Sequence, residues 1–305
     1  FQTPPAIREA LAAALAADPE IGKYTMPDGR PALRAAAADA HAAATGQAAD
    51  PDREVLVTAG NIEAMNALLH VLLDPGDEVI LTDPGFASHV QQIRLCGGRP
   101  VFWPLDEAGG WQLDPSSLEA RITPRTKAII LISPNNPTGT VFREAELRQT
   151  GRIAQRHGLV LLLDNAYMNF CFAHRDEWFS LASVPELHGQ VASLFSFSKG
   201  YAMAGFRVGY VALSSKNGRE GRGTRAYEEM LKVQDTIAIC TSRISQMAAL
   251  GALEAGREWV YEQVKTLDEG RAAILEAMSE LEEIIGGDGA MYVMGKLPDG
   301  VDDQV

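Results

Sequence analysis

From Glu54 onward, the sequence alternates between short runs rich in β-branched residues and longer stretches with helical periodicity. This alternation predicts an α/β fold with a largely parallel sheet sandwiched by helices, because consecutive parallel strands are joined by helical crossovers. In such sheets, ligands bind beyond the carboxyl ends of the strands. We expect seven strands, near residues 55–58, 78–81, 100–103, 127–132, 159–164, 193–197 and 207–213.

Helices are expected before and after this region as well as within it. Residues 4–17 and 31–45 are strong helix formers that follow prolines, which suit a first helical turn. Residues 228–254 return to helical periodicity, and residues 258–285 predict one long helix. Residues 214–227 are rich in Gly, Arg and Lys and predict a mobile surface loop or short insertion.

The composition is that of a globular protein and excludes several classes of function. With 305 residues, 46% of them hydrophobic, the chain can bury one large core and a second, smaller one. Its formal net charge of −13 argues against nucleic acid or an anionic membrane as the main partner. No apolar run reaches the roughly 18 residues that a membrane span requires. The three cysteines form no C-x-x-C pair, which favours neither a disulfide framework nor a metal site and fits a reducing cytoplasm.

Residues 196–210 hold one lysine between hydroxyl groups and an arginine. Ser196 and Ser198 precede Lys199, and Arg207 follows it after eight residues. A lysine that forms a Schiff base needs a partly desolvated site, where its amine is neutral often enough to attack an aldehyde. The two serines and the forked guanidinium of Arg207 suit a dianionic phosphate. The alternative is a strand end with a glycine turn and a solvated lysine.

Residues 58–64 predict a second anion-binding feature. Gly60, Asn61 and Ile62 lie where a strand runs into a helix, so unpaired N–H groups point outward at the positive end of the helix dipole. An ordinary helix N-cap would account for the same residues.

Two polar residues stand at the ends of other strands. Asp164 follows five apolar residues, and a buried carboxylate is costly unless it has a partner, so it is a candidate functional residue. A strand-end carboxylate that faces water is the alternative. Asn136 lies in a turn fixed by two prolines and a glycine, from which its amide can donate a hydrogen bond.

Together these motifs resemble the class I/II aminotransferases of fold type I, which depend on pyridoxal 5′-phosphate (PLP). The resemblance runs from residue 1 to about residue 290. It implies an aminotransferase that moves an amino group from an L-amino acid to a 2-oxo acid through an aldimine on Lys199. The catalytic residues would be Lys199, Asp164 and Tyr167.

The resemblance also implies how PLP is held. Asp164 would pair with the pyridine nitrogen, Asn136 and Tyr167 would donate to the phenolic oxygen, and Phe86 would stack on the ring. His89, one turn after Phe86, either lines the site or is a surface histidine. The family often has a hydroxyl or basic side chain where this sequence has Asn61 and Ile62, which leaves the phosphate to backbone amides and the Asn61 amide.

A homodimer with shared active sites is a further implication, because Tyr24 matches a tyrosine that reaches the phosphate of the neighbouring subunit. We expect residues 1–25 to be an N-terminal helix of the small domain and residues 26–255 to be the large PLP-binding domain. Residues 256–305 would be a bridging helix and the start of a truncated α+β small domain. The arginine that grips the substrate carboxylate is expected beyond residue 305, so the amino donor and acceptor stay open.

Two other functions remain as alternatives. The same scaffold supports a PLP-dependent lyase, racemase or oxidase, because the fold does not fix which bond is broken. A non-catalytic cofactor-binding module is the third class. Retention of Lys199 and Asp164 argues against this class, and the sequence has no basic helix-turn-helix segment.

Overall fold

The computed structural model describes residues 1–172, 178–214, 222–281 and 283–297. Its centre is a seven-stranded sheet with the order β1-β7-β6-β5-β4-β2-β3. Strand β7 runs opposite to the other six strands of this sheet, so the sheet is mostly parallel as expected. The strands are β1 (Val55–Thr58), β2 (Glu78–Asp83), β3 (Arg99–Pro104), β4 (Thr126–Ile132), β5 (Val160–Asp164), β6 (Val191–Ser196) and β7 (Gly209–Leu213).

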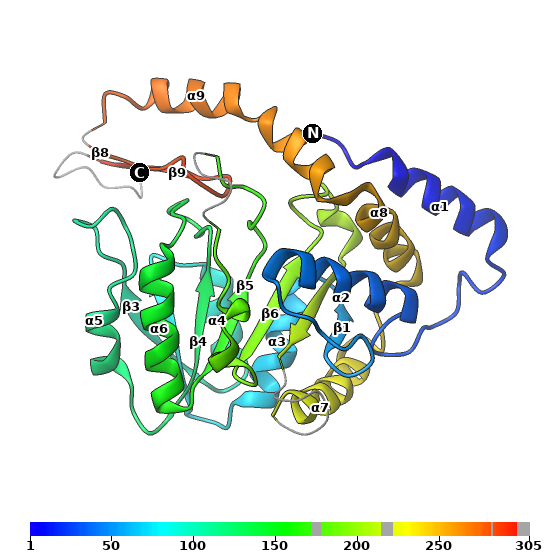
Figure 1. Cartoon of the computed structure of the whole chain (residues 1–305), viewed down its shortest axis with the longest axis horizontal. Helices are drawn as coiled ribbons and strands as arrows, with labels where there is room; N and C mark the ends of the chain where they lie inside the picture. The colour runs from blue at the N-terminus through cyan, green and yellow to red at the C-terminus, as the bar shows by residue number, and fades with distance from the viewer. Residues whose placement is uncertain (173–177, 215–221, 282, 298–305) are drawn as a thin grey trace.

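Helices lie on both sides of the sheet (Figure 1). The α-helices are α1 (Pro5–Ala17), α2 (Pro31–Thr45), α3 (Asn61–Leu72), α4 (Ala87–Leu95), α5 (Pro115–Leu118), α6 (Glu144–His157), α7 (Arg222–Ile237), α8 (Arg243–Lys265) and α9 (Asp268–Ala277). Short 3-10 helices span Glu119–Arg121, Leu181–Ser183, Pro185–Leu187 and Ala204–Phe206.

The central strand β5 is buried on both faces, which explains its continuous apolar run. Leu162 packs into a cluster with side chains of α3 and α7, whereas Leu161 and Leu163 pack with α6 on the opposite face. Successive side chains of a strand point to opposite faces, so these three leucines join two layers of helices to one sheet. The last residue of this strand, Asp164, therefore stands on a rigid support at the carboxyl edge.

The face of β6 and β7 away from α3 is covered by α2 and α8. Helix α1 packs on α8 in turn, and the two backbones approach closely at Gly251. A Cβ atom at this glycine would lie 2.7 Å from the carbonyl oxygen of Ala6. Glycine thus sets how closely the N-terminal helix packs on the rest of the chain.

The C-terminal part differs from the expected long helix over residues 258–285. Helix α8 is interrupted at Gly256, whose φ of 78° and ψ of 172° are not helical, and a second helix, α9, ends at Ala277. Residues Glu283–Gly286 form β8, which pairs antiparallel with β9 (Val293–Lys296). The apolar residues at positions 284 and 285 continue the helical spacing by chance, but they are isoleucines, and β-branched residues favour a strand.

The region around residue 222 also differs from its prediction. Helix α7 begins at Arg222, inside the stretch expected to be a loop, and residues 215–221 of that stretch lie outside the described residues. Tyr227 and Met230 of α7 are buried against α3 and the sheet, so tertiary packing outweighs the polar composition. The helical stretch expected over residues 228–254 is divided between α7 and α8.

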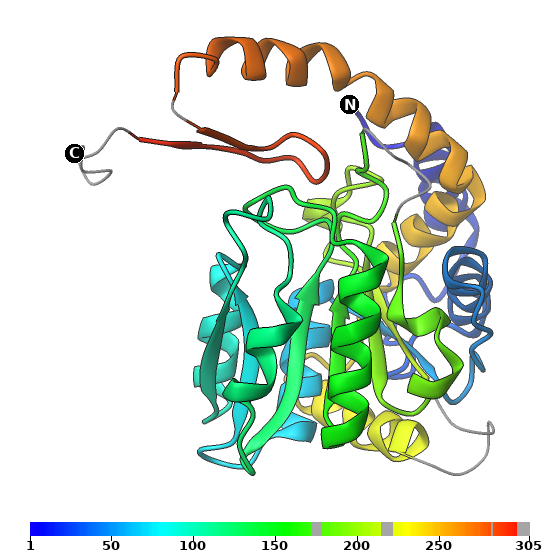
Figure 2. The same ribbon diagram turned by 60° about the vertical axis from the view of Figure 1, so that its left-hand side comes forward.

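The β8-β9 hairpin lies across the carboxyl edge of the large sheet, beneath α9 (Figure 2). Backbone hydrogen bonds join it to the loop after β5, including one of 2.9 Å from Ala290 N–H to the Phe170 carbonyl. This small sheet lies where the second domain was expected, although the boundaries at residues 25 and 255 stay predictions. Within the described ranges, no helix is both long and apolar enough to cross a membrane.

Candidate active site

Asp164, at the end of β5, is held by groups from three parts of the chain. It is 5% exposed. Its Oδ1 accepts hydrogen bonds from Asn61 Nδ2 at 2.7 Å and from the Ala166 backbone N–H at 3.0 Å. The Nε2 atom of His89 lies 3.4 Å from Oδ2. These contacts fix the carboxylate in one orientation at the sheet edge, so it is not the water-facing strand end that was the alternative.

Of the partners of Asp164, Asn61 is placed differently from what the sequence predicts, and His89 matches one of its two predicted alternatives. The Asn61 side chain, which was expected to help bind phosphate, is turned towards Asp164 because the buried carboxylate needs a donor. His89 is only 2% exposed and therefore is not a surface histidine. Its ring meets Phe86 edge to face, with centroids 5.2 Å apart and planes at 83°, so the half-buried Phe86 packs on the histidine that contacts this carboxylate.

Arg207 lies against the N-terminus of α3, although more than 140 residues separate them in the sequence. Its guanidinium donates to the carbonyls of Ala59 at 3.3 Å and Ala204 at 2.9 Å. A Cβ atom at Gly60 would lie 2.7 Å from the Arg207 NH2 atom, so the close approach requires glycine. The backbone of Arg207 is itself left-handed, with φ of 52°, a strained conformation for a non-glycine residue that is typical of functional sites.

The N–H groups of Asn61 and Ile62 belong to the first turn of α3, where no earlier helical carbonyl accepts them. The Ile62 side chain is 43% exposed. Together with the Arg207 guanidinium, these groups make a cradle of donors at the positive end of a helix dipole.

Lys199 lies in the turn directly after β6, between its two serines and Gly200. Ser198 N–H donates to Ser196 Oγ at 3.1 Å, and Ala202 N–H donates to the Lys199 carbonyl at 3.1 Å. Lys199 is half-buried, and its amine makes no hydrogen bond or ion pair with any residue of the described ranges. An amine that is partly withdrawn from water and not held by a carboxylate is suited to act as a nucleophile.

Asn136 and Tyr167 meet as expected, and a third residue, Tyr292, joins them. The Asn136 amide nitrogen lies 3.5 Å from the Tyr167 hydroxyl and 3.4 Å from the Tyr292 hydroxyl. The two phenolic oxygens are 2.5 Å apart. Burial raises the pKa of Tyr167 well above its ordinary value, so this hydroxyl keeps its proton at neutral pH.

The sequence motifs do not indicate a role for Tyr292. Its only local signal was a tyrosine in the stretch expected to begin the second domain, 125 residues after Tyr167. Tyr24, by contrast, is expected to reach a phosphate, but it lies on the loop between α1 and α2, away from the candidate site of its own chain. It is 75% exposed and thus faces outward from the protomer.

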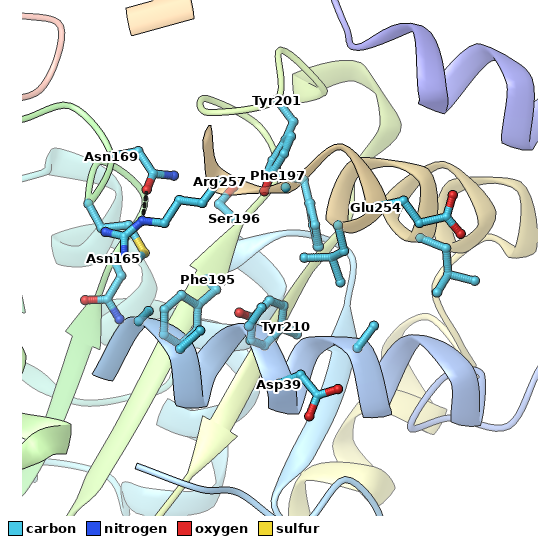
Figure 3. A pocket seen from close by; sticks show the side chains of 18 of the residues that line it. Asp39, Asn165, Asn169, Phe195, Ser196, Phe197, Tyr201, Tyr210, Glu254 and Arg257 are labelled. Carbon is cyan, nitrogen blue, oxygen red and sulfur yellow. Dashed lines mark hydrogen bonds between the residues drawn. The ribbon is translucent and has the colours of Figure 1, made fainter. Parts of the chain in front are cut away.

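A groove of about 510 Å³ lies behind the strand ends, between α2 and α8 (Figure 3). Its lining includes alanines of α2 and a floor of aromatic side chains, and Arg257 at its side donates to Asn169 Oδ1 at 3.0 Å. Of the candidate site residues, only Ser196 borders this groove. The candidate site is therefore defined by converging polar groups at the sheet edge and not by this hollow.

The residues present fit PLP in two respects. The cradle beside Gly60 consists of donors, which suits a dianionic phosphate, and a Cβ atom there would fill it. The buried carboxylate of Asp164 suits a protonated pyridine nitrogen. Among the described residues, no group of three or more His, Cys, Asp or Glu side chains is arranged to hold a metal ion.

Known proteins are similar to this chain in both sequence and structure. The family model for aminotransferase class I and II matches residues 1–304. A relative from Bacillus subtilis, YugH, is 31% identical over 231 residues, which are 76% of this chain and 57% of that protein. An aromatic aminotransferase from Arabidopsis thaliana is 32% identical over 288 residues, which are 93% of this chain and 69% of that protein.

The solved structure of the aspartate aminotransferase from Thermus thermophilus with maleate matches with a TM-score of 0.88 at 32% identity. The match covers 96% of this chain and 74% of that one. The chain thus spans 57% of the first curated relative and 69% of the second. These findings confirm the family and the fold type expected from the sequence, and none favours a lyase, a racemase or an oxidase. The chain belongs to the class I and II aminotransferases, a family of enzymes that transfer amino groups.

Proposed function

We propose that this chain binds PLP at Lys199 and transfers an amino group from an L-amino acid to a 2-oxo acid. The observation that carries the proposal is the convergence, at one sheet edge, of three features. They are a half-buried lysine without an ionic partner among the residues that the structure describes, a cradle of hydrogen-bond donors that suits a phosphate, and a buried carboxylate with three neighbours.

Each part of the cofactor has a proposed partner. The phosphate would be held by Arg207, by the first N–H groups of α3, and by Ser196 and Ser198. The pyridine ring would stack on Phe86, which contributes about 0.5–1.5 kcal/mol beyond burial. Asp164 would hold the pyridine nitrogen, with Asn61 and His89 keeping its carboxylate in place.

When bound, PLP supplies an electron sink for the pair released from the substrate Cα. The chain's own residues then act on protons. The Lys199 amine, set free when the amine of the substrate takes its place, would accept the proton from the substrate Cα and deliver it to the cofactor, which is general acid–base work. Asn136 and Tyr167, whose polar atoms lie 3.5 Å apart, would donate to the phenolic oxygen of PLP and stabilise its negative charge.

We further propose that a second copy of the chain completes the site. The loop with Tyr24 and the first turn of α8, which follows the segment after α7, are connected by a hydrogen bond of 2.9 Å from Gln246 Nε2 to Thr25 Oγ1. Together they expose an apolar surface, and large exposed apolar surfaces mark interfaces. Its members are Tyr24 at 75% exposed, Met26 at 69%, Ile237 at 50%, Ile239 at 40% and Ile244 at 39%. Burial of this surface in a homodimer would bring Tyr24 to the partner's phosphate.

The amino donor stays open, since the related proteins carry the names of aspartate and of aromatic amino acids. A cytoplasmic location is proposed from the composition, whose three cysteines are widely spaced and form no C-x-x-C pair.

The proposal is tested by visible absorption spectroscopy of the purified chain, with PLP added. We expect an absorption band in the visible that a donor L-amino acid bleaches and that a 2-oxo acid restores. Accumulation of ammonia or pyruvate without bleaching would contradict amino transfer in favour of the lyase or oxidase alternatives. Gel filtration across a range of concentrations measures the proposed dimer, and a monomer at every concentration would refute it.

A further inference from the structure

We infer that Tyr292 is a positioning residue for the proposed reaction, which directs the hydroxyl of Tyr167 towards the cofactor and so ties the β8-β9 hairpin to the active site. The inference rests on the proposed function, because Tyr292 acts on PLP only through Tyr167.

The three polar groups of this cluster form a closed triangle. The hydroxyls of Tyr167 and Tyr292 are 2.5 Å apart, and the Asn136 amide nitrogen lies 3.5 Å and 3.4 Å from them. The two rings meet edge to face, with centroids 5.5 Å apart and planes at 73°. This ring contact fixes where the Tyr292 hydroxyl stands, even when the hydrogen bond rearranges.

The number of hydrogens in the triangle determines which hydroxyl can donate to Tyr167. The Asn136 amide nitrogen has two hydrogens and can only donate, so the hydroxyl oxygens of both tyrosines accept from it, and with PLP bound one of the two hydrogens would turn to the phenolic oxygen of the cofactor. The two phenols have one hydrogen each, and one of these bridges the pair. An anionic oxygen beside Tyr167 selects the arrangement in which Tyr292 donates to Tyr167 and the Tyr167 hydrogen points outward. Without the Tyr292 hydroxyl, nothing in the triangle donates to Tyr167 except the longer bond from Asn136.

The hairpin backbone is packed so that Tyr292 cannot easily move away. A Cβ atom at Gly139, in the turn with Asn136, would lie 2.9 Å from the carbonyl oxygens of both Gly289 and Tyr292. Ala290 is fully buried and left-handed, with φ of 56°, and its N–H donates to Phe170 at 2.9 Å. A strained alanine two residues before Tyr292 is maintained only where the surroundings over-determine it. The strained backbone at Ala290 thus belongs to the segment that holds the Tyr292 side chain at the site.

The test measures the visible absorption of bound PLP as a function of pH. The chromophore loses a proton as the pH rises, and a donor to its phenolic oxygen stabilises the deprotonated form. Tyr292→Phe keeps the ring and removes only the hydroxyl. We expect it to raise the midpoint of the absorption change by about 0.5–1 pH unit, since a less well directed hydrogen bond stabilises the anion less.

A double-mutant cycle separates positioning from packing. Tyr292→Phe should shift the midpoint in the wild-type background and should add less than about 0.2 pH unit in a Tyr167→Phe background, because coupled residues are not additive. Met291→Leu, in the same turn and with Met291 half exposed, is the matched control and should leave the midpoint unchanged. Replacing Tyr292 with 3-fluorotyrosine, a stronger donor of nearly the same shape, should lower the midpoint and serves if Tyr292→Phe does not fold.

Three results would overturn the inference. They are an unchanged midpoint in a folded Tyr292→Phe protein, a shift of equal size with and without the Tyr167 hydroxyl, and an unchanged midpoint with 3-fluorotyrosine. Absence of any visible band in the wild-type protein would instead refute the proposed function together with the inference. If the wild-type protein titrates normally and the variants do not behave as expected, the inference about Tyr292 fails while the proposed function stands.

Discussion

Substituting alanine for Gly60 changes the phosphate cradle at one atom and has two effects that can be measured separately. Gly60 has φ of 82° and ψ of 173°, a region of backbone space that is essentially restricted to glycine and costs other residues about 1–3 kcal/mol. The new Cβ atom would also lie 2.7 Å from the Arg207 NH2 atom and would displace the guanidinium. The loss of one charge-assisted contact of about 1.4 kcal/mol weakens binding about tenfold.

We therefore expect Gly60→Ala to lower the free energy of unfolding by about 1–3 kcal/mol and to raise the Kd for PLP at least about tenfold. Urea unfolding of the chain without PLP gives the first quantity, and a fluorescence titration with PLP gives the second. Gly46→Ala is the matched control. Gly46 is also left-handed, with φ of 71°, but a Cβ atom there would meet nothing within 4 Å. It should cost about 1–2 kcal/mol of stability and leave PLP affinity unchanged. Equal PLP affinity in Gly60→Ala and the wild type would refute the assignment of this cradle to phosphate.

Three further substitutions test other parts of the account. Asp164→Asn keeps the size of the side chain but removes its negative charge. We expect amino transfer to slow by about a hundred- to a thousandfold while PLP still binds, since electrostatic stabilisation of this kind is worth about 3–4 kcal/mol. Wild-type rates in single-turnover absorption experiments would contradict this role. His41 is 3% exposed, and burial lowers its pKa from 6.5 to about 4. Below pH 6.5 the unfolded chain therefore binds a proton at His41 more readily than the folded chain does, and the free energy of unfolding falls as the pH drops towards 4. In urea unfolding experiments, His41→Phe should reduce the loss of unfolding free energy between pH 7 and pH 5 by about 2 kcal/mol. An unchanged pH dependence would show that His41 is not the group that titrates. Tyr227→Phe removes a hydrogen bond of 2.9 Å to Asp28 and should cost about 0.5–1.5 kcal/mol of stability, with no change in the absorption spectrum of bound PLP.

The sequence predicts the large sheet well because its strands are defined by local patterns. The expected strand over residues 55–58 matches β1 completely, and the apolar run that ends in Asp164 is β5. Burial of these strands on both faces requires continuous apolar residues, so composition alone marks them. Asp164 stands out for the same reason, as a charge at the end of a buried run.

The residues that the sequence does not reveal depend on contacts between distant segments. Asn61 bonds to Asp164 across 103 residues, and no local pattern indicates that its amide faces the carboxylate and not the phosphate. Tyr292 reaches the site only because the chain turns back after α9 into the β8-β9 hairpin. The sequence pattern does not predict that turn, because Ile284 and Ile285 keep a helical spacing and favour one helix over residues 258–285.

The measurement that tests the central claim most directly is identification of the lysine that holds PLP. The purified chain is incubated with PLP, treated with borohydride, which fixes a lysine-bound aldehyde covalently, and then digested and mapped by mass spectrometry. The account predicts one equivalent of label, on Lys199, the half-buried lysine in the turn after β6. Label on any other lysine, or no label on a chain that remains folded, would contradict it.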